Sequence, residues 1–70
     1  MNREPVSSSN IASVGYDADS QTLEIEFASG SVYQYYNVGP DLYQQFLIAP
    51  SKGQFLSMYI RNAYPFSKVG

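Results

Sequence analysis

The sequence predicts a single α+β domain, in which a three-stranded antiparallel β-meander is followed by two short helices packed on one sheet face. Two observations carry this prediction. Residues 22–27 alternate apolar and charged side chains with a period of two, as a half-buried strand does. After residue 39 the apolar side chains recur at helical spacing, and Pro50 divides this helical part in two. Seventy residues leave room for one such domain.

The first nine residues are predicted to form a flexible arm, because they are polar and include a proline and three serines. The domain itself is expected to cover residues 10–69 and to start with a strand over residues 10–16. The Asp-Ala-Asp-Ser segment at 17–20 is expected to form the turn that follows, because its side chains bond readily to nearby backbone amides. Residues 32–38, rich in β-branched and aromatic side chains, then complete the meander.

Three prolines limit the helical part of the chain. Pro40 fits the first turn of a helix and Asp41 favours its positive end, so the first helix is expected to begin there and to end before Pro50. A second helix is expected after Ser51, because the four residues from Ser51 match the capping-box pattern. A helix cannot continue through Pro65, so residues 63–66 are predicted to pack back in extended form.

The hairpin between the second and third strands has two possible registers. A two-residue loop would bury Gln34 and turn Tyr33 and Tyr35 away from the core. A three-residue loop over residues 28–30, with Gly30 in the left-handed conformation, shifts the register by one residue and exchanges the two faces. We favour the second register, because a small core has little room for an unpaired amide. Tyr33 and Tyr35 are then primarily core residues under the helices, and a stacking role is secondary.

The favoured register assigns a candidate protein-binding surface to the open face of the sheet. Its centre is apolar and its rim is acidic, which suits a basic segment of a partner protein. An ordinary amphipathic sheet with one exposed tyrosine would explain the same pattern. The candidate residues are Glu24, Glu26, Val32, Gln34 and Tyr36.

Charge is distributed unevenly along the chain, which has a net charge of −2. Residues 1–50 contain all six acids and one arginine, whereas residues 51–70 contain three cations and no acid. This basic segment is a candidate site for RNA or another anion, with cations on phosphates and Tyr36 or Tyr64 stacked on bases. Lys52 is expected at a helix N-terminus, where backbone amides attract anions. The candidate residues of the segment are Lys52, Arg61, Tyr64 and Lys68.

Catalysis is the least favoured class of function. The chain contains no cysteine and no histidine, which excludes thiolate nucleophiles, imidazole-based triads and the usual zinc ligands. Glu24 and Glu26 would lie about 7 Å apart on one strand face, but the solvent-facing alternation of a strand is the stronger explanation for that spacing. We therefore expect no enzyme activity, no metal and no cofactor. No apolar run approaches the roughly 20 residues that span a membrane, and a small secreted domain without disulfides would be unusual, so we expect a cytoplasmic protein. We also expect it to be a monomer.

Three sequence elements, in order, resemble the KTSC domain family. They are the Tyr33-Gln34-Tyr35 centre, the Ser51-Lys52-Gly53 turn with Phe55 after it, and the closing Tyr64-Pro65-Phe66. The resemblance covers residues 8–69. That family is named for a segment at the C-terminus of some lysyl-tRNA synthetases, so the resemblance implies RNA binding. The whole chain is also similar to a small bacteriophage regulator that binds host RNA polymerase.

Together these features predict a non-catalytic binding module. A protein partner is favoured over RNA, because an acidic sheet face would repel phosphates. The similarity to the phage regulator implies that this partner is bacterial RNA polymerase and that binding interferes with the initiation of transcription in the host cytoplasm. A small RNA-binding module that uses the basic C-terminal segment is the alternative.

Overall fold

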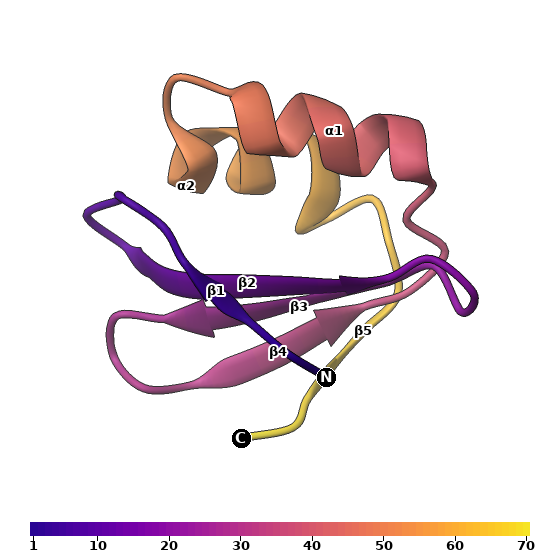
Figure 1. Cartoon of the computed structure of the whole chain (residues 1–70), viewed down its shortest axis with the longest axis horizontal. Helices are drawn as coiled ribbons and strands as arrows, with labels where there is room; N and C mark the ends of the chain where they lie inside the picture. Colours follow the sequence, from indigo (N-terminus) through magenta and orange to yellow (C-terminus); the bar gives the residue numbers. More distant parts are fainter.

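The structure is a computed structural model that describes residues 1–70. Two layers make up the fold, an antiparallel sheet and a helical layer that covers one of its faces (Figure 1). Both chain ends lie on the opposite side of the sheet from the helices. None of the helices combines the length and apolar character needed to cross a membrane. The elements are β1 (Glu4–Pro5), β2 (Ile11–Asp17), β3 (Thr22–Phe27), β4 (Val32–Tyr35), α1 (Pro40–Ile48), α2 (Lys52–Phe55), the π-helical η1 (Leu56–Ile60) and β5 (Phe66–Lys68).

The α+β class is confirmed, but the predicted number of strands is wrong. The sheet has five strands in the order β1-β2-β3-β4-β5, and the predicted meander forms its centre, β2 to β4. At one edge β1 pairs with β2, inside the segment for which the sequence predicts a flexible arm. At the other edge β5 pairs with β4. Both added strands are two or three residues long, too short for an alternating pattern to mark them.

The β3–β4 hairpin has the register that the three-residue loop predicts. Ile25 lies opposite Tyr33, and the backbone amide of Phe27 donates to the carbonyl oxygen of Ser31 at 2.9 Å. Gly30 closes the loop with a φ of 96°, a conformation that side chains beyond glycine rarely adopt. Gln34 consequently lies on the open face of the sheet, opposite Glu24.

The helices begin where the sequence predicts. α1 starts at Pro40 and ends before Pro50, and the hydroxyl oxygen of Ser51 accepts a hydrogen bond from the amide of Gln54 at 3.3 Å. The second helix then widens into η1, where the amide of Arg61 donates to a carbonyl five residues earlier at 2.8 Å. This change of winding was not predicted from the sequence.

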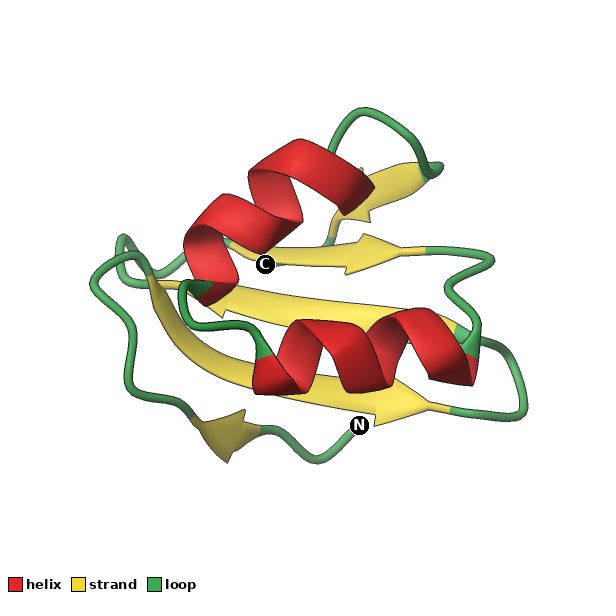
Figure 2. Ribbon diagram, turned by 90° about the horizontal axis from the view of Figure 1, so that it is seen from above, coloured by secondary structure: helices red, strands yellow, loops and turns green.

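The core lies between the sheet and the helices, which lie above the strands (Figure 2). It combines apolar side chains from the upper face of the meander with side chains from the lower faces of the helical segments. Burial of such side chains is the main force that holds a domain of this size together. The nine buried apolar residues are Ile11, Val14, Leu23, Ile25, Tyr35, Val38, Phe46, Leu56 and Ile60.

Candidate functional site

The five residues predicted to form a protein-binding surface do share the open face, but the N-terminal segment of the chain covers part of it. Arg3 forms an ion pair with Glu24, with 2.6 Å between Nη1 and Oε2. Gln34 donates from Nε2 to the other oxygen of the same carboxylate at 2.8 Å. The segment can cross here because Gly15 has no side chain, and a Cβ at that position would lie 2.6 Å from the carbonyl oxygen of Asn2. Glu24 is therefore only 7% exposed.

Most polar side chains of this face bind one another. Burial alone would raise the pKa of Glu24, but the hydrogen bond from Gln34 and the hydrogen bond and charge of Arg3 outweigh burial and lower that pKa. Tyr36 donates its hydroxyl to Oε1 of Gln34 at 3.2 Å. Glu26 accepts a hydrogen bond from the hydroxyl of Ser13 at 2.7 Å. The rim is therefore an internal network, and Glu24 is not the free acid that the sequence suggests.

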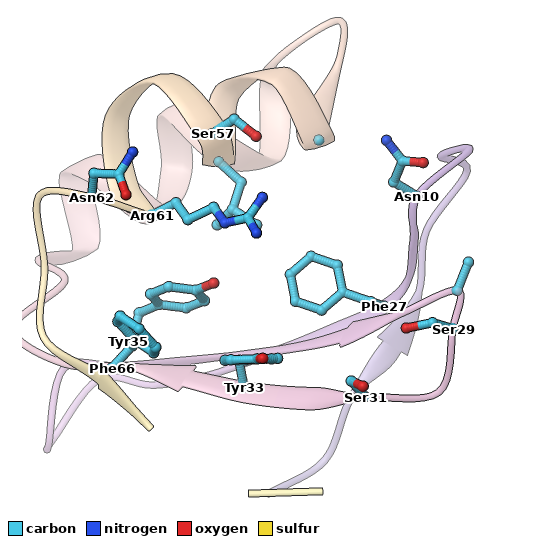
Figure 3. Close-up of a pocket in the computed structure, with 13 residues that line it drawn as sticks. Asn10, Phe27, Ser29, Ser31, Tyr33, Tyr35, Ser57, Arg61, Asn62 and Phe66 are labelled. Atoms are coloured by element: carbon cyan, nitrogen blue, oxygen red, sulfur yellow. The ribbon is translucent and has the colours of Figure 1, made fainter. Parts of the chain in front are cut away.

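A cavity of about 540 Å³ opens on the other side of the sheet, between the second helix and the β3–β4 hairpin. We call it the recess. Figure 3 shows its polar and aromatic side chains converging from the helix above and the strands below. The residues that line it include no aspartate and no glutamate. They are Asn10, Phe27, Ala28, Ser29, Ser31, Tyr33, Tyr35, Gly53, Leu56, Ser57, Arg61, Asn62 and Phe66.

Arg61 supplies the charge of the recess. It follows the last residue of η1, and its guanidinium group extends into the space between helix and sheet (Figure 3). The one ion pair of the chain joins Arg3 and Glu24, so the guanidinium of Arg61 has no acidic partner. A guanidinium in that state can form two parallel hydrogen bonds to a phosphate or carboxylate.

Tyr35 lies below Arg61 and is only 2% exposed. Burial raises the pKa of its hydroxyl, the charge of Arg61 opposes that rise, and Tyr33 adds to it. The hydroxyl makes no hydrogen bond within the protein, yet no buried polar atom lacks a partner, so this oxygen must be open to the recess. In Figure 3 it points into the cavity. At neutral pH it is a protonated group that can donate to a ligand.

The floor of the recess is aromatic. The ring of Tyr33 meets that of Phe27 edge to face, with centroids 5.6 Å apart and planes at 84°. On its other side Tyr33 lies 6.0 Å from the ring of Phe66, which is 56% exposed. The expectation that Tyr33 and Tyr35 are both core residues therefore holds for Tyr35, whereas Tyr33 is half-buried and borders the cavity.

Polar side chains without protein partners surround this floor. The side chains of Asn10, Ser57 and Asn62 take part in none of the hydrogen bonds of the protein. Asn10 lies beside α2, with its Nδ2 3.5 Å from the position that a Cβ would take at Gly53. These groups are free to donate and accept hydrogen bonds with a ligand. Groups of three or more acidic, histidine or cysteine side chains that could hold a metal ion are absent.

The structure divides the four residues of the predicted RNA or anion site. Arg61 lines the recess. Lys52 lies at the start of α2 and Lys68 is exposed on β5, and neither lines the recess. Tyr64 is half-buried against the core. Phe27 was not predicted as a site residue. The three-residue loop favoured from the sequence nevertheless places it on the same sheet face as Tyr33.

Comparisons with known proteins identify relatives of this chain and of its fold. The sequence model of the KTSC domain matches residues 7–64. A lysine–tRNA ligase of Nostoc punctiforme is 41% identical over 59 residues, which are 84% of this chain and 10% of the ligase. An uncharacterised protein of Stutzerimonas stutzeri is 39% identical over 87% of this chain and 86% of its own length. The crystal structure of a KTSC domain protein from Yersinia pestis is 43% identical, with a TM-score of 0.94 over 99% of this chain and 97% of that one.

Proposed function

This chain belongs to the KTSC domain family, and we propose that it is a non-catalytic module that binds single-stranded RNA in the recess beside Arg61. One observation carries the proposal: the guanidinium of Arg61 has no ion-pair partner and projects into an aromatic-lined cavity without acids. RNA offers the two groups that such a cavity attracts. Its bases stack on aromatic rings, and its phosphates bind guanidinium groups.

The names of the relatives support an RNA ligand. Three of the matched proteins are lysine–tRNA ligases, enzymes whose name gives a transfer RNA as substrate. The chain spans about a tenth of each ligase, so the shared region is a small part of a much larger enzyme. We propose that this part contacts RNA in the ligases and that the same role holds for this chain.

The chemistry of the recess fits binding better than catalysis. Its volume of about 540 Å³ lies within the usual range of ligand pockets and can hold a nucleotide. Its polar groups are a guanidinium, hydroxyls and amides, none of which is a general base near neutral pH. The raised pKa of Tyr35 keeps that hydroxyl protonated. These groups can recognise a ligand without transforming it.

The predicted contact with bacterial RNA polymerase stays a prediction. The surface proposed for it has an acidic rim on the open face, and one of the two acids of that rim, Glu24, is paired with Arg3 inside the same molecule. The acids also lie across the sheet from the recess, so the repulsion of RNA that they cause is weaker on the helical side. We therefore place RNA ahead of a protein partner.

A titration of Arg61→Gln with fluorescently labelled single-stranded RNA tests the proposal. Loss of a charge-assisted contact to phosphate should raise the dissociation constant about tenfold or more, measured by fluorescence anisotropy at fixed salt. Lys52→Gln is the matched control, because it removes the same charge from the second helix but lies outside the recess. That control should lose only the general attraction to phosphates, about two- to threefold.

Two results would overturn the proposal. Wild-type protein that binds no RNA at low salt would remove RNA as the ligand. Equal losses in Arg61→Gln and Lys52→Gln would show that any binding depends on overall charge and not on the recess. Arg61 is exposed and Lys52 is half-buried, and thermal unfolding of both variants checks that each keeps the wild-type fold.

A further inference from the structure

Resting on the proposed function, we infer that the recess takes one unpaired nucleotide at a time, with its base stacked on Tyr33 and its phosphate on Arg61. The two groups lie on opposite walls of the same cavity, since Tyr33 comes from β4 below and Arg61 follows η1 above (Figure 3). A nucleotide carries its own two recognition groups, a planar base and an anion, on the two ends of a sugar. The wall with Tyr33 suits the base, and the wall with Arg61 suits the phosphate.

Tyr33 is the ring best placed to stack on a base. Figure 3 shows it edge-on, so that one ring face is turned toward the space below Arg61. Phe27 stands at 84° to it and forms a side wall, and Phe66 borders it on the other side. Tyr35 cannot take the same role, because it is 2% exposed and offers mainly its hydroxyl. A flat ligand is therefore directed onto Tyr33.

The polar groups of the recess suit the other parts of the nucleotide. Arg61 can bind a phosphate through two parallel hydrogen bonds, and it has no acidic partner from which the phosphate must displace it. Asn10 carries both a donor and an acceptor on one free amide, as recognition of a base edge requires. The open hydroxyl of Tyr35 lies below Arg61 (Figure 3). Each part of a nucleotide thus meets a group of matching chemistry.

A paired base cannot occupy this site. In a duplex both faces of each base are covered by neighbouring bases, and its edge is engaged by its partner. To reach Tyr33 the base must leave the stack and enter a space bounded by a helix and a sheet. Only Arg61 supplies charge inside the recess, so no row of cations exists there to follow a duplex backbone. The site therefore selects unpaired nucleotides.

Photocrosslinking tests this inference directly. A single-stranded RNA with one 5-iodouridine forms a covalent bond under ultraviolet light with an aromatic side chain stacked on that base, and mass spectrometry identifies the residue. We expect the crosslink on Tyr33, and we expect the same RNA annealed to its complement to crosslink poorly. Free 5-iodouridine monophosphate distinguishes RNA from a small nucleotide as the source of the same chemistry.

Three variants measure the contribution of the ring to affinity. Tyr33→Leu keeps an apolar side chain but removes the stacking face, and should weaken binding of single-stranded RNA about tenfold. Tyr33→Phe keeps the face and should bind within about twofold of wild type. Tyr36→Leu is the matched control, because it removes a tyrosine from the same hairpin strand region on the opposite face of the sheet and should leave affinity unchanged.

The possible failures are distinguishable. If single-stranded RNA binds with dependence on Arg61 but Tyr33→Leu binds as wild type and the crosslink lies elsewhere, the inference is overturned and the proposed function stands. If no RNA binds, the proposed function fails first. If the free monophosphate crosslinks to Tyr33 and binds as tightly as RNA, the recess remains a nucleotide site and RNA is overturned as its source. Strong crosslinking of the annealed duplex overturns the selection for unpaired bases.

Discussion

The open face of the sheet and the recess hold similar chemical groups in opposite states. On the open face the guanidinium of Arg3 and the carboxylate of Glu24 bind each other, and Gln34 and Tyr36 extend the same network. In the recess the guanidinium of Arg61 and the nearby amides and hydroxyls have no partner within the protein. The recess also lacks acids and contains more aromatic rings than the open face. The availability of its polar groups, however, follows from the absence of internal partners.

This contrast gives the two regions different expected roles. A polar group with a good internal partner contributes to folding and loses that contribution when the partner is removed. A polar group without one contributes little to folding and is available to a ligand. Substitutions on the open face should therefore change stability and leave RNA affinity alone, whereas substitutions in the recess should do the reverse.

The largest stability effect is expected at Gly15. Gly15→Ala places a Cβ 2.6 Å from the carbonyl oxygen of Asn2, so the N-terminal segment must move off the sheet and the pair between Arg3 and Glu24 is disturbed. We expect the free energy of unfolding to fall by about 2 kcal/mol, measured by urea denaturation. RNA affinity should stay at the wild-type value, because the recess lies across the sheet.

Gly39→Ser provides the control for this change. Gly39 has no atom within reach of an added Cβ, and it occupies the N-cap of α1, where serine is favoured. Its stability should be equal to that of the wild type or slightly higher. A Gly15→Ala protein as stable as the wild type would show that the N-terminal segment contributes nothing measurable to the fold. It would contradict the expectation that contacts on the open face stabilise the domain.

A smaller effect, with a distinct pH dependence, is expected at Glu24. Its folded-state pKa lies below the unfolded value of about 4.3, so the stability that it supplies is fully present above that value and is lost as the pH falls through the folded-state pKa. Glu24→Gln should reduce the free energy of unfolding by about 1 kcal/mol at neutral pH. The difference from wild type should shrink progressively below about pH 4.

Glu26→Gln is the comparison for this prediction. Glutamine keeps an oxygen that can accept the hydrogen bond from Ser13, and Glu26 has no cation bound to it, so its loss should be smaller than that of Glu24→Gln. Denaturation curves across the acid range measure both. A difference in the free energy of unfolding between wild type and Glu24→Gln that is the same at every pH would mean that the charge of the carboxylate does not stabilise the fold.

The smallest effect is expected at the outer end of the network. Tyr36→Phe removes one hydroxyl, which donates to Gln34 at 3.2 Å on a half-exposed surface. The cost should be about 0.5 kcal/mol, close to the resolution of a thermal melt. A loss of RNA affinity in this variant would contradict the proposed site, because it would place RNA on the open face.

The centre of the fold was predictable because several signals agree there. Alternation marks β3, two prolines limit α1, and the unfavourable burial of Gln34 selects the correct hairpin register. The edges were not predictable. β1 has two residues and is held by backbone pairing and by Arg3, whose partner lies 21 residues away in sequence. No local pattern in the sequence marks the widened turn of η1.

The candidate site was predicted only in part for the same reason. Arg61 was predicted as a cation of the basic segment. Its neighbours in the sequence do not show that it lines the same cavity as Tyr33, which is 28 positions earlier. The acids of β3 looked free because their partner Arg3 lies in a segment expected to be flexible. Both outcomes depend on contacts between distant parts of the chain.

The position of the two chain ends has a practical consequence. Because both ends emerge on the side of the sheet away from the helices, a copy fused to another protein or immobilised through its C-terminus would turn the recess outward, toward solvent (Figure 1). The geometry therefore suits display on a larger assembly or on a sensor surface without a long spacer.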